Sequence, residues 1–255
     1  MKLGFIGCGA IGTDVAIAAD SFEEISEIFL FDKDKKIMKK LDDKLKKSSQ
    51  TTLETMIKKS DIIFEAASQE AVSIYGKKVL DHGKDLIIMS IGSLCDEEFR
   101  NELINTAKKN NCKIYLPSGA VCGIDGLLSA SVGGLNEVTL VTTKPPASFG
   151  KNLDERTILF EGTARDAVKK FPANINVAAS LSLAGKGFDD TKVEIVADPV
   201  ATRISHKILA HGAFGRLRVE LENMPNPNNP GSSYMASLSA IAKLRRIIDP
   251  IQIGA

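Results

Sequence analysis

A glycine-rich turn near the N-terminus constrains this chain more than any other feature. An apolar run over residues 3–6 enters Gly7-Cys8-Gly9-Ala10-Ile11-Gly12 and a helix-like stretch, and a second apolar run, 28–31, leads to Asp32. The first glycine permits a tight turn, the second lets a pyrophosphate approach the backbone, and the third lets the next helix pack closely on the strand. The helix N-terminus then presents unpaired N–H groups to the phosphates. The arrangement predicts a dinucleotide-binding domain.

Asp32 is the predicted determinant of cofactor choice. An acid at the end of the second strand accepts hydrogen bonds from both ribose hydroxyls of an adenosine and repels a 2′-phosphate. We therefore expect NAD to be preferred, with some tolerance of NADP because Lys33, Lys35 and Lys36 partly offset the charge. The alternative is that Asp32 only starts a turn, a role that aspartate often has. The predicted cofactor contacts in this half of the chain are Gly7, Gly9, Ala10, Ile11, Gly12 and Asp32.

Composition narrows the class of protein. The 255 residues are 44% hydrophobic and 25% charged, enough to bury a full core in one large domain or two modest ones. A net charge of only +1 predicts neither a nucleic-acid nor a membrane partner, and no apolar run approaches the length of a membrane span. The N-terminus is itself the first expected strand, so we expect a cytoplasmic enzyme acting on a small molecule. Four cysteines without C-x-x-C spacing predict neither disulfides nor a metal site: Cys8, Cys95, Cys112 and Cys122.

The first half of the chain alternates apolar runs with helical stretches. Continuous apolar runs are typical of buried parallel strands, and the helices between them supply the crossovers. Residues 1–118 are therefore predicted to form a Rossmann domain, a doubly wound parallel sheet with its ligand crevice outside the carboxyl ends of the strands. The expected later strands are 61–67, 85–90 and 113–117, and the expected helices between them are 69–80 and 96–110.

The pattern changes after residue 120. Residues 137–144 alternate in polarity, and 216–222 alternate strictly, as in an antiparallel sheet with one wet face. We expect a second, smaller α+β domain over residues 119–232, which carries the substrate site and pairs two subunits into a homodimer. Its further strands are predicted at 192–198 and 204–210 and its covering helices at 163–170 and 176–183, while a last helix, 233–249, is a candidate to pack back on the first domain.

The three histidines are the candidate acid–base groups, because histidine titrates near neutral pH. His82 is predicted in a surface turn and His211 in the turn after a strand. His206 shares a strand face with Ile204 and Ile208, so partial desolvation is expected to keep it neutral and able to accept a proton. The other interpretation of His206 is a satisfied core histidine. Cys122 is a weak candidate nucleophile, since no activating base is identifiable.

Separated motifs in the second half add a resemblance that periodicity does not supply. They are 116–120, 123–126, 174–185, Asp198-Pro199, 205–208, 212–215, 222–225, Ser232-Ser233 and 238–242. In this order, and essentially end to end, they resemble the L-aspartate dehydrogenase family. The resemblance implies NAD(P)-dependent oxidation of L-aspartate to 2-iminosuccinate, which hydrolyses to oxaloacetate and ammonia or supplies NAD biosynthesis. It also implies that His206 is the active-site residue and that Ala120 and Asn176 contact the cofactor, with Asn174 a close rival to Asn176.

Two further hypotheses remain open at this point. The same two-domain layout would suit a reductase of another small dicarboxylate imine, similar to dihydrodipicolinate reductase, or a non-catalytic NAD sensor. If the substrate is L-aspartate, its two carboxylates need cationic or N–H partners. The sequence offers Lys144, Arg203, Lys207 and the backbone of 182–185 without ranking them.

Overall fold

The computed structural model describes residues 1–171 and 176–254 of the chain. They form two compact units, Met1–Pro117 with Ser237–Ile251 and Ser118–Ala236 with Gln252–Ala255. The first unit therefore takes in most of the last helix, α9 (Tyr234–Ile248). No helix within the described residues is long and apolar enough to cross a membrane.

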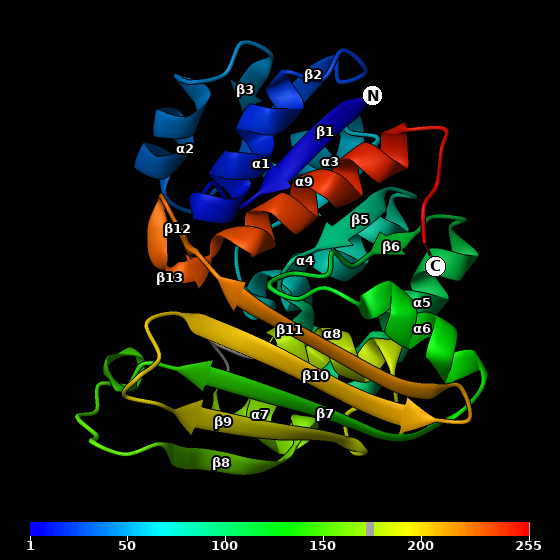
Figure 1. Ribbon diagram of the computed structural model, residues 1–255. Helices are drawn as coiled ribbons and strands as arrows, with labels where there is room; N and C mark the ends of the chain where they lie inside the picture. The colour runs from blue at the N-terminus through cyan, green and yellow to red at the C-terminus, as the bar shows by residue number, and fades with distance from the viewer. Residues whose placement is uncertain (172–175, 255) are drawn as a thin grey trace. The chain divides into compact units, whose positions relative to one another are not determined.

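The first unit is built on a six-stranded parallel sheet, which confirms the predicted doubly wound α/β fold (Figure 1). The strand order β3-β2-β1-β4-β5-β6 reverses direction at β1, where a doubly wound sheet opens a ligand crevice. The strands are β1 (Lys2–Ile6), β2 (Glu27–Phe31), β3 (Ser48–Gln50), β4 (Ile62–Glu65), β5 (Asp85–Ile88) and β6 (Ile114–Tyr115). The helices are α1 (Ala10–Asp20), α2 (Lys35–Asp42), α3 (Leu53–Lys59), α4 (Gln69–Asp81), α5 (Glu97–Lys109) and the short 3₁₀ turn η1 (Ile91–Cys95).

The core of this unit follows from the apolar strands. Phe5 of β1 and Phe64 of β4 are fully buried, and their ring centroids lie 5.3 Å apart. Side-chain caps start the helices around the sheet: Asp34 accepts from the N–H groups at the start of α2, and Ser68 does so for α4. Helix α9 packs on the same unit, where its Ser237 hydroxyl donates to Asp14 Oδ2 at 2.6 Å.

The second unit contains a five-stranded sheet of order β11-β10-β7-β9-β8. It is mainly antiparallel, as predicted, but β7 and β9 run parallel to each other. The elements are α6 (Ile124–Val132), β7 (Leu135–Lys144), the 3₁₀ turn η2 (Pro146–Phe149), β8 (Thr157–Thr163), α7 (Ala164–Lys170), α8 (Asn176–Ala184), β9 (Thr191–Ala197), β10 (Ile204–Gly212) and β11 (Gly215–Asn223). A small two-stranded ribbon, β12 (Pro225–Asn226) and β13 (Asn229–Ser233), follows β11.

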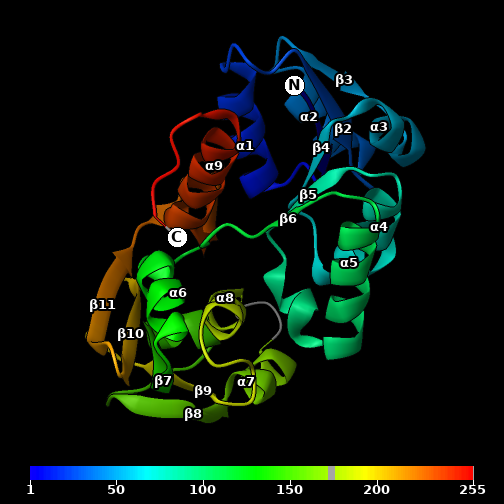
Figure 2. The same ribbon diagram turned by 90° about the vertical axis from the view of Figure 1, so that its right-hand side faces the viewer.

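The helices α6, α7 and α8 cover one face of this sheet, and none of the described helices of this unit lies on the opposite face (Figure 2). Strand β7 shows the consequence, since Val138, Leu140, Thr142 and Lys144 are buried while the residues between them are partly exposed. This inner face is the one that carries the candidate chemistry described below.

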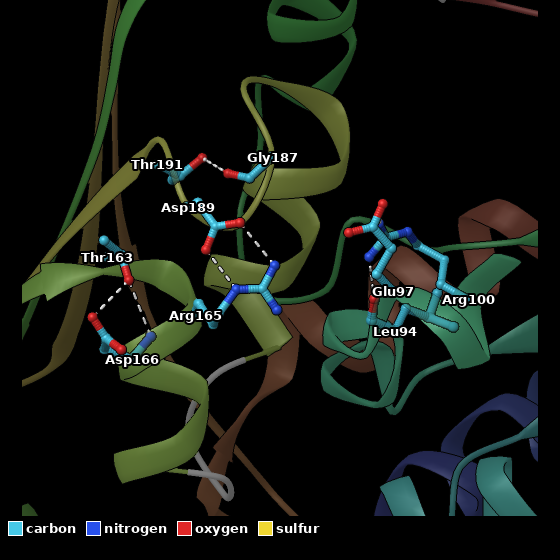
Figure 3. A network of polar contacts seen from close by, with 9 residues as sticks. All are labelled: Leu94, Glu97, Arg100, Thr163, Arg165, Asp166, Gly187, Asp189 and Thr191. Carbon is cyan, nitrogen blue, oxygen red and sulfur yellow. Dashed lines mark hydrogen bonds and ion pairs between the residues drawn. The ribbon is translucent and has the colours of Figure 1, made fainter.

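Local polar contacts fix the ends of these elements (Figure 3). Thr163 caps α7 by accepting from the backbone N–H of Asp166, and the guanidinium of Arg165 forms a two-point ion pair with Asp189 in the turn before β9. In the first unit, Arg100 Nη1 of α5 donates to the carbonyl oxygen of Leu94 at 2.8 Å. These bonds hold turns that the apolar pattern alone leaves undetermined.

Candidate active site

The three glycines of the N-terminal turn have three different structural roles. Gly7 has a φ of +98°, and a Cβ there would lie 2.7 Å from the carbonyl oxygen of Ala66. A Cβ on Gly12 would lie 2.2 Å from the carbonyl oxygen of Gly7, so the absence of a side chain lets α1 pack against the turn. Around the Cβ position of Gly9, in contrast, no described heavy atom lies within 4 Å. The turn therefore leaves open space where a pyrophosphate would approach the helix N-terminus.

A cavity of about 280 Å³ lies at the carboxyl ends of β1, β2 and β4. Gly7, Gly9 and Asp32 line it, whereas Ala10 and Ile11 begin α1 beside it and Gly12 is buried. The rest of its lining is Ile6, Phe31, Lys33, Ile37, Ala66, Ala67, Ser68, Ala71 and Tyr75. The cavity has three features that fit a dinucleotide: it lies at the carboxyl ends of parallel strands, it is lined by the backbone of Gly7 and Gly9, and it contains the Asp32 carboxylate.

Asp32 has the turn role that the sequence left open, and it also lines the cavity. Its Oδ2 accepts a hydrogen bond from the backbone N–H of Cys8 at 2.7 Å, and its Oδ1 accepts from that of Asp34 at 2.8 Å. The carboxylate thus ties the glycine turn to β2 and starts the next turn, and its remaining lone pairs can accept from ribose hydroxyls. Burial, together with the charge of Asp32, raises the pKa of the Cys8 thiol to about 12, so this cysteine stays protonated.

Glu65 is a buried acid that the sequence analysis missed. It ends β4 and is 1% exposed. Oε1 accepts from the N–H groups of Ala67 and Ser68 and from the Ser90 hydroxyl, and Oε2 accepts from the Ser90 N–H, at 2.8–3.1 Å. Burial raises the pKa of Glu65, and these hydrogen bonds oppose the rise. The carboxylate therefore joins the loop after β4 to the loop after β5, next to the cavity. The sequence feature that could have indicated this role is an acidic residue at the end of an apolar strand.

His206 lies on the inner face of β10 and is 5% exposed. Thr142 of β7 stands opposite it in the strand register, and the Thr142 hydroxyl oxygen lies 3.0 Å from His206 Nδ1. Burial first, and the charge of Lys144 second, lower the pKa of the imidazole from 6.5 to about 4. The ring is therefore neutral near pH 7, and the hydroxyl fixes its orientation.

Lys144 is a buried cation on the same face of β7, two residues beyond Thr142. It is 7% exposed, and burial lowers the pKa of its ammonium group. Lys144 and Thr142 both line a small cavity whose other walls are Leu140, Phe149, Phe171, Val193 and Ile195. The sheet thus brings a neutral base and an ammonium group to one face.

The other two histidines lie elsewhere. His82 follows α4 as an exposed turn residue, as predicted, and its Nδ1 lies 2.8 Å from the carbonyl oxygen of Lys78. His211 was predicted in the turn after its strand, but it lies within β10, because that strand continues to Gly212 in register with β11. Its Nε2 lies 3.2 Å from Glu137 Oε2 on the outer face of the sheet.

The remaining predicted residues belong to the second unit. The carbonyl oxygen of Ala120 accepts from Asn223 Nδ2 at 3.0 Å, and Asn223 Oδ1 accepts from the buried Ser233 hydroxyl. Asn176 is exposed at the start of α8, and its carbonyl oxygen accepts from the Ser180 hydroxyl. Asn174 lies outside the described residues, and Cys122 is exposed in the loop before α6.

Family comparisons match both units of the chain. Residues 7–117 match the family described as homoserine dehydrogenase, NAD binding domain, and residues 125–247 match aspartate dehydrogenase, C-terminal. The first match agrees with the glycine turn and Asp32. The chain thus contains a nicotinamide-dinucleotide domain followed by a dehydrogenase domain.

Whole-chain relatives share the same name. The chain is 45% identical to the L-aspartate dehydrogenase of Methanosarcina acetivorans, covering 100% of this chain and 99% of that one, and 40% identical to that of Methanothermobacter thermautotrophicus, covering 100% and 98%. The solved aspartate dehydrogenase of Thermotoga maritima is 30% identical, with a TM-score of 0.85 over 100% of this chain and 99% of that one. A dipicolinate-bound dihydrodipicolinate reductase from Paenisporosarcina, at 12% identity and a TM-score of 0.57, shares the fold alone. At this identity over the full length, the chain belongs to the L-aspartate dehydrogenase family.

Proposed function

We propose that this protein oxidises L-aspartate at Cα to 2-iminosuccinate, which hydrolyses to oxaloacetate and ammonia. The observation that carries the proposal is the buried, neutral His206 held by Thr142, in a chain that belongs to this family over its full length. The alternative substrate, a cyclic dicarboxylate imine, has only a fold-level likeness at 12% identity behind it. A non-catalytic NAD sensor would not require a desolvated imidazole.

The cofactor site suits NAD or NADP. Gly7 and Gly9 would hold the pyrophosphate and Asp32 the adenosine ribose, with Ala120 and Asn176 as further proposed contacts. When bound, the oxidised nicotinamide supplies the hydride acceptor. The Asp32 carboxylate disfavours a 2′-phosphate, so NAD is the proposed preferred form.

His206 is the proposed general base. The substrate amine must lose a proton before its lone pair can assist loss of hydride from Cα. An imidazole with a pKa of about 4 is unprotonated at neutral pH, which is the state that can accept this proton or assist the addition of water to the imine. The negative charge of a bound dicarboxylate raises this pKa toward neutrality and so strengthens the base. Thr142, at 3.0 Å from Nδ1, orients the ring.

A homodimer is the proposed assembly. Within the described residues of the second unit, no helix lies on the face of the β11-β10-β7-β9-β8 sheet opposite α6, α7 and α8, and this face carries a hollow of about 460 Å³ lined by Leu209, His211, Arg216 and neighbouring residues. Pairing two such faces would bury it. Light scattering is expected to give about 55 kDa, twice the chain mass of 27.4 kDa, and a value near one chain mass would contradict the dimer.

We also propose a cytoplasmic enzyme that supplies iminosuccinate to NAD biosynthesis. All four cysteines are free thiols, three of them buried, which agrees with a reducing compartment. The biosynthetic role is supported by the chemistry of the product alone. Formation of quinolinate when the purified protein is coupled to a quinolinate-forming enzyme would test it, and hydrolysis to oxaloacetate in place of coupling would contradict it.

The reaction is tested by absorbance at 340 nm with L-aspartate and NAD or NADP, and in reverse with oxaloacetate, ammonia and reduced cofactor. Turnover specific to L-aspartate is expected, and His206→Ala should keep NADH binding while losing about 10²–10⁴ in rate. No turnover in either direction by a protein that still binds NADH would overturn the assignment of L-aspartate as substrate. Turnover of a cyclic imine would favour the reductase. Full activity of His206→Ala would remove His206 from the mechanism.

Cofactor preference is tested separately with Asp32→Asn. The amide keeps an oxygen acceptor for the Cys8 or Asp34 N–H but removes the charge. The ratio of kcat/KM for NADP to that for NAD is expected to rise about tenfold or more. An unchanged ratio would show that Asp32 acts only in the turn. Asp34→Asn, at an exposed helix cap, is the matched control.

A further inference from the structure

Two charged residues of opposite sign line the dinucleotide cavity. Among its described lining residues, Asp32 and Lys33 are the charged ones, and the others are glycine, apolar residues, a serine and a tyrosine. Lys35 and Lys36, which the sequence grouped with Lys33, are exposed at the start of α2 and are not among the described residues of this wall. The structure thus selects Lys33 from the three lysines that follow β2.

The Asp32 carboxylate cannot turn away from a 2′-phosphate without losing backbone hydrogen bonds. Its Oδ2 accepts from the Cys8 N–H at 2.7 Å, and its Oδ1 accepts from the Asp34 N–H at 2.8 Å. Rotation of the carboxylate would take this acceptor away from both N–H groups, which is costly. A cofactor that carries a 2′-phosphate therefore meets a fixed negative charge, and a cation close to that charge is needed to offset the repulsion.

Lys33 forms an ion pair that such a phosphate can replace. Its Nζ lies 3.7 Å from Oε2 of Glu70, in the first turn of α4, and the two side chains are 67% and 70% exposed. Ion pairs this exposed contribute little to stability. A phosphate monoester has a charge of about −1.5 to −2 and three strong acceptor oxygens, so it competes well with a single carboxylate for the ammonium group.

The neutral polar groups of the cavity cannot take over this role. The Ser68 hydroxyl oxygen accepts from the Ala71 N–H at 3.1 Å, and the Tyr75 ring stands edge-on to Phe31 with the ring centroids 5.9 Å apart. Both hydroxyls can donate a hydrogen bond, but neither has a charge that offsets Asp32.

We infer that Lys33 binds the 2′-phosphate of NADP and that Glu70 holds the lysine when this phosphate is absent. The inference rests on the cofactor site proposed above and adds to it the residue that determines how well NADP is accepted. Asp32 disfavours the phosphate and Lys33 compensates in part, so the preference for NAD is finite. The flexible stem of a lysine suits this role, because the ammonium group can turn back to Glu70 when NAD is bound.

The experiment measures the dissociation constants of NADH and NADPH by nicotinamide fluorescence and compares their ratio between variants. Lys33→Met removes the ammonium group, Lys33→Arg keeps the charge, and Lys40→Met removes an exposed lysine from the last turn of α2 as the matched control. The ratio of the NADPH constant to the NADH constant is expected to rise about threefold or more in Lys33→Met and to stay within about twofold in the other two. A smaller rise in Lys33→Met, or an equal rise in Lys40→Met or Lys33→Arg, overturns the inference.

Glu70 provides a second prediction of opposite sign. Glu70→Gln releases Lys33, so the same ratio is expected to fall, and the fall should be smaller when Glu70→Gln is combined with Lys33→Met. An unchanged ratio in Glu70→Gln, or an equal fall in the double variant, overturns the role of Glu70 in holding Lys33.

Competition at the adenosine end provides a readout that does not involve the nicotinamide. AMP and adenosine 2′,5′-bisphosphate differ by the 2′-phosphate alone, and each is titrated as a competitor of NADH. Lys33→Met should weaken the bisphosphate more than AMP, and equal weakening of the two overturns the inference.

The same titrations separate this inference from the proposed function. An unsubstituted protein that binds NADH but not NADPH overturns the inference while the proposed preference for NAD stands. A protein that binds neither nucleotide overturns the proposed cofactor site and the inference together. Absence of turnover with L-aspartate by a protein that binds both nucleotides overturns the proposed substrate, and the ratio of the two constants still decides the role of Lys33.

Discussion

Replacing His206 by glutamine is expected to make the free energy of unfolding less sensitive to acidification between pH 6.5 and about 4. Burial, with a further contribution from Lys144, lowers the pKa of His206 from 6.5 to about 4. In the unfolded chain the imidazole keeps a pKa near 6.5, so between these two values the unfolded chain binds a proton that the folded protein does not. Falling pH in this window therefore favours unfolding.

The magnitude follows from the same two values. A fall in pKa from 6.5 to about 4 corresponds to about 3 kcal/mol, at about 1.4 kcal/mol for each pH unit. This stability is fully present above pH 6.5 and is lost progressively as the pH falls to about 4. Glutamine does not titrate and retains an amide that can bond with the Thr142 hydroxyl, so the variant lacks this component of the pH dependence.

The assay is urea unfolding at several values between pH 7.5 and about 4.5. Because carboxylates titrate in both proteins, the measured quantity is the difference between the two free energies of unfolding at each pH. That difference is expected to shift by about 2 kcal/mol or more over the range. Parallel pH profiles for the unsubstituted protein and His206→Gln would refute the desolvated imidazole and, with it, the physical basis of a neutral base.

Two further predictions concern the dinucleotide cavity. The free energy of unfolding of Gly9→Ala should lie within about 1 kcal/mol of that of the original protein, because the methyl group enters open space. The same methyl group occupies the space proposed for the pyrophosphate, so NADH should bind about tenfold or more weakly. Gly12→Ala should lose about 1–3 kcal/mol of unfolding free energy, because its Cβ meets the Gly7 carbonyl. Urea unfolding and NADH titration measure the two effects, and equal stability of the two variants would contradict the packing role of Gly12. Glu65→Gln should lose about 1–3 kcal/mol of unfolding free energy and bind NADH more weakly, because an amide N–H₂ group then faces backbone donors. Glu70→Gln, at an exposed residue, should change neither quantity. A Glu65→Gln variant with unchanged stability and full NADH affinity would contradict the anchoring role.

The strongest local signals predicted the most of this structure. Short-range physical causes determine the glycine turn and the apolar strands. Backbone conformation and close packing require glycine at fixed positions of the Gly7–Gly12 turn, and burial on both faces requires continuous apolar runs in the strands, with Asp32 following the second run. Such causes appear in the sequence as residue types at fixed spacing. Strand β8 escaped prediction because its register shifts between Ile158 and Phe160, which breaks the period of two. Helix α6 escaped because Gly123, with φ of +77°, precedes it without a side-chain cap.

The sequence by itself therefore determined the fold class, the dinucleotide turn and the family, and it singled out His206 through an apolar face and a resemblance. Only the tertiary structure decided what surrounds that histidine. Thr142 is 64 residues away in the chain and reaches Nδ1 through strand register, and Lys144 follows it onto the same buried face. Likewise, Glu65 became an anchor because Ser90 of a neighbouring loop donates to it. Such partners arise from pairing between distant strands, and a one-dimensional pattern carries no information about which strands will lie together.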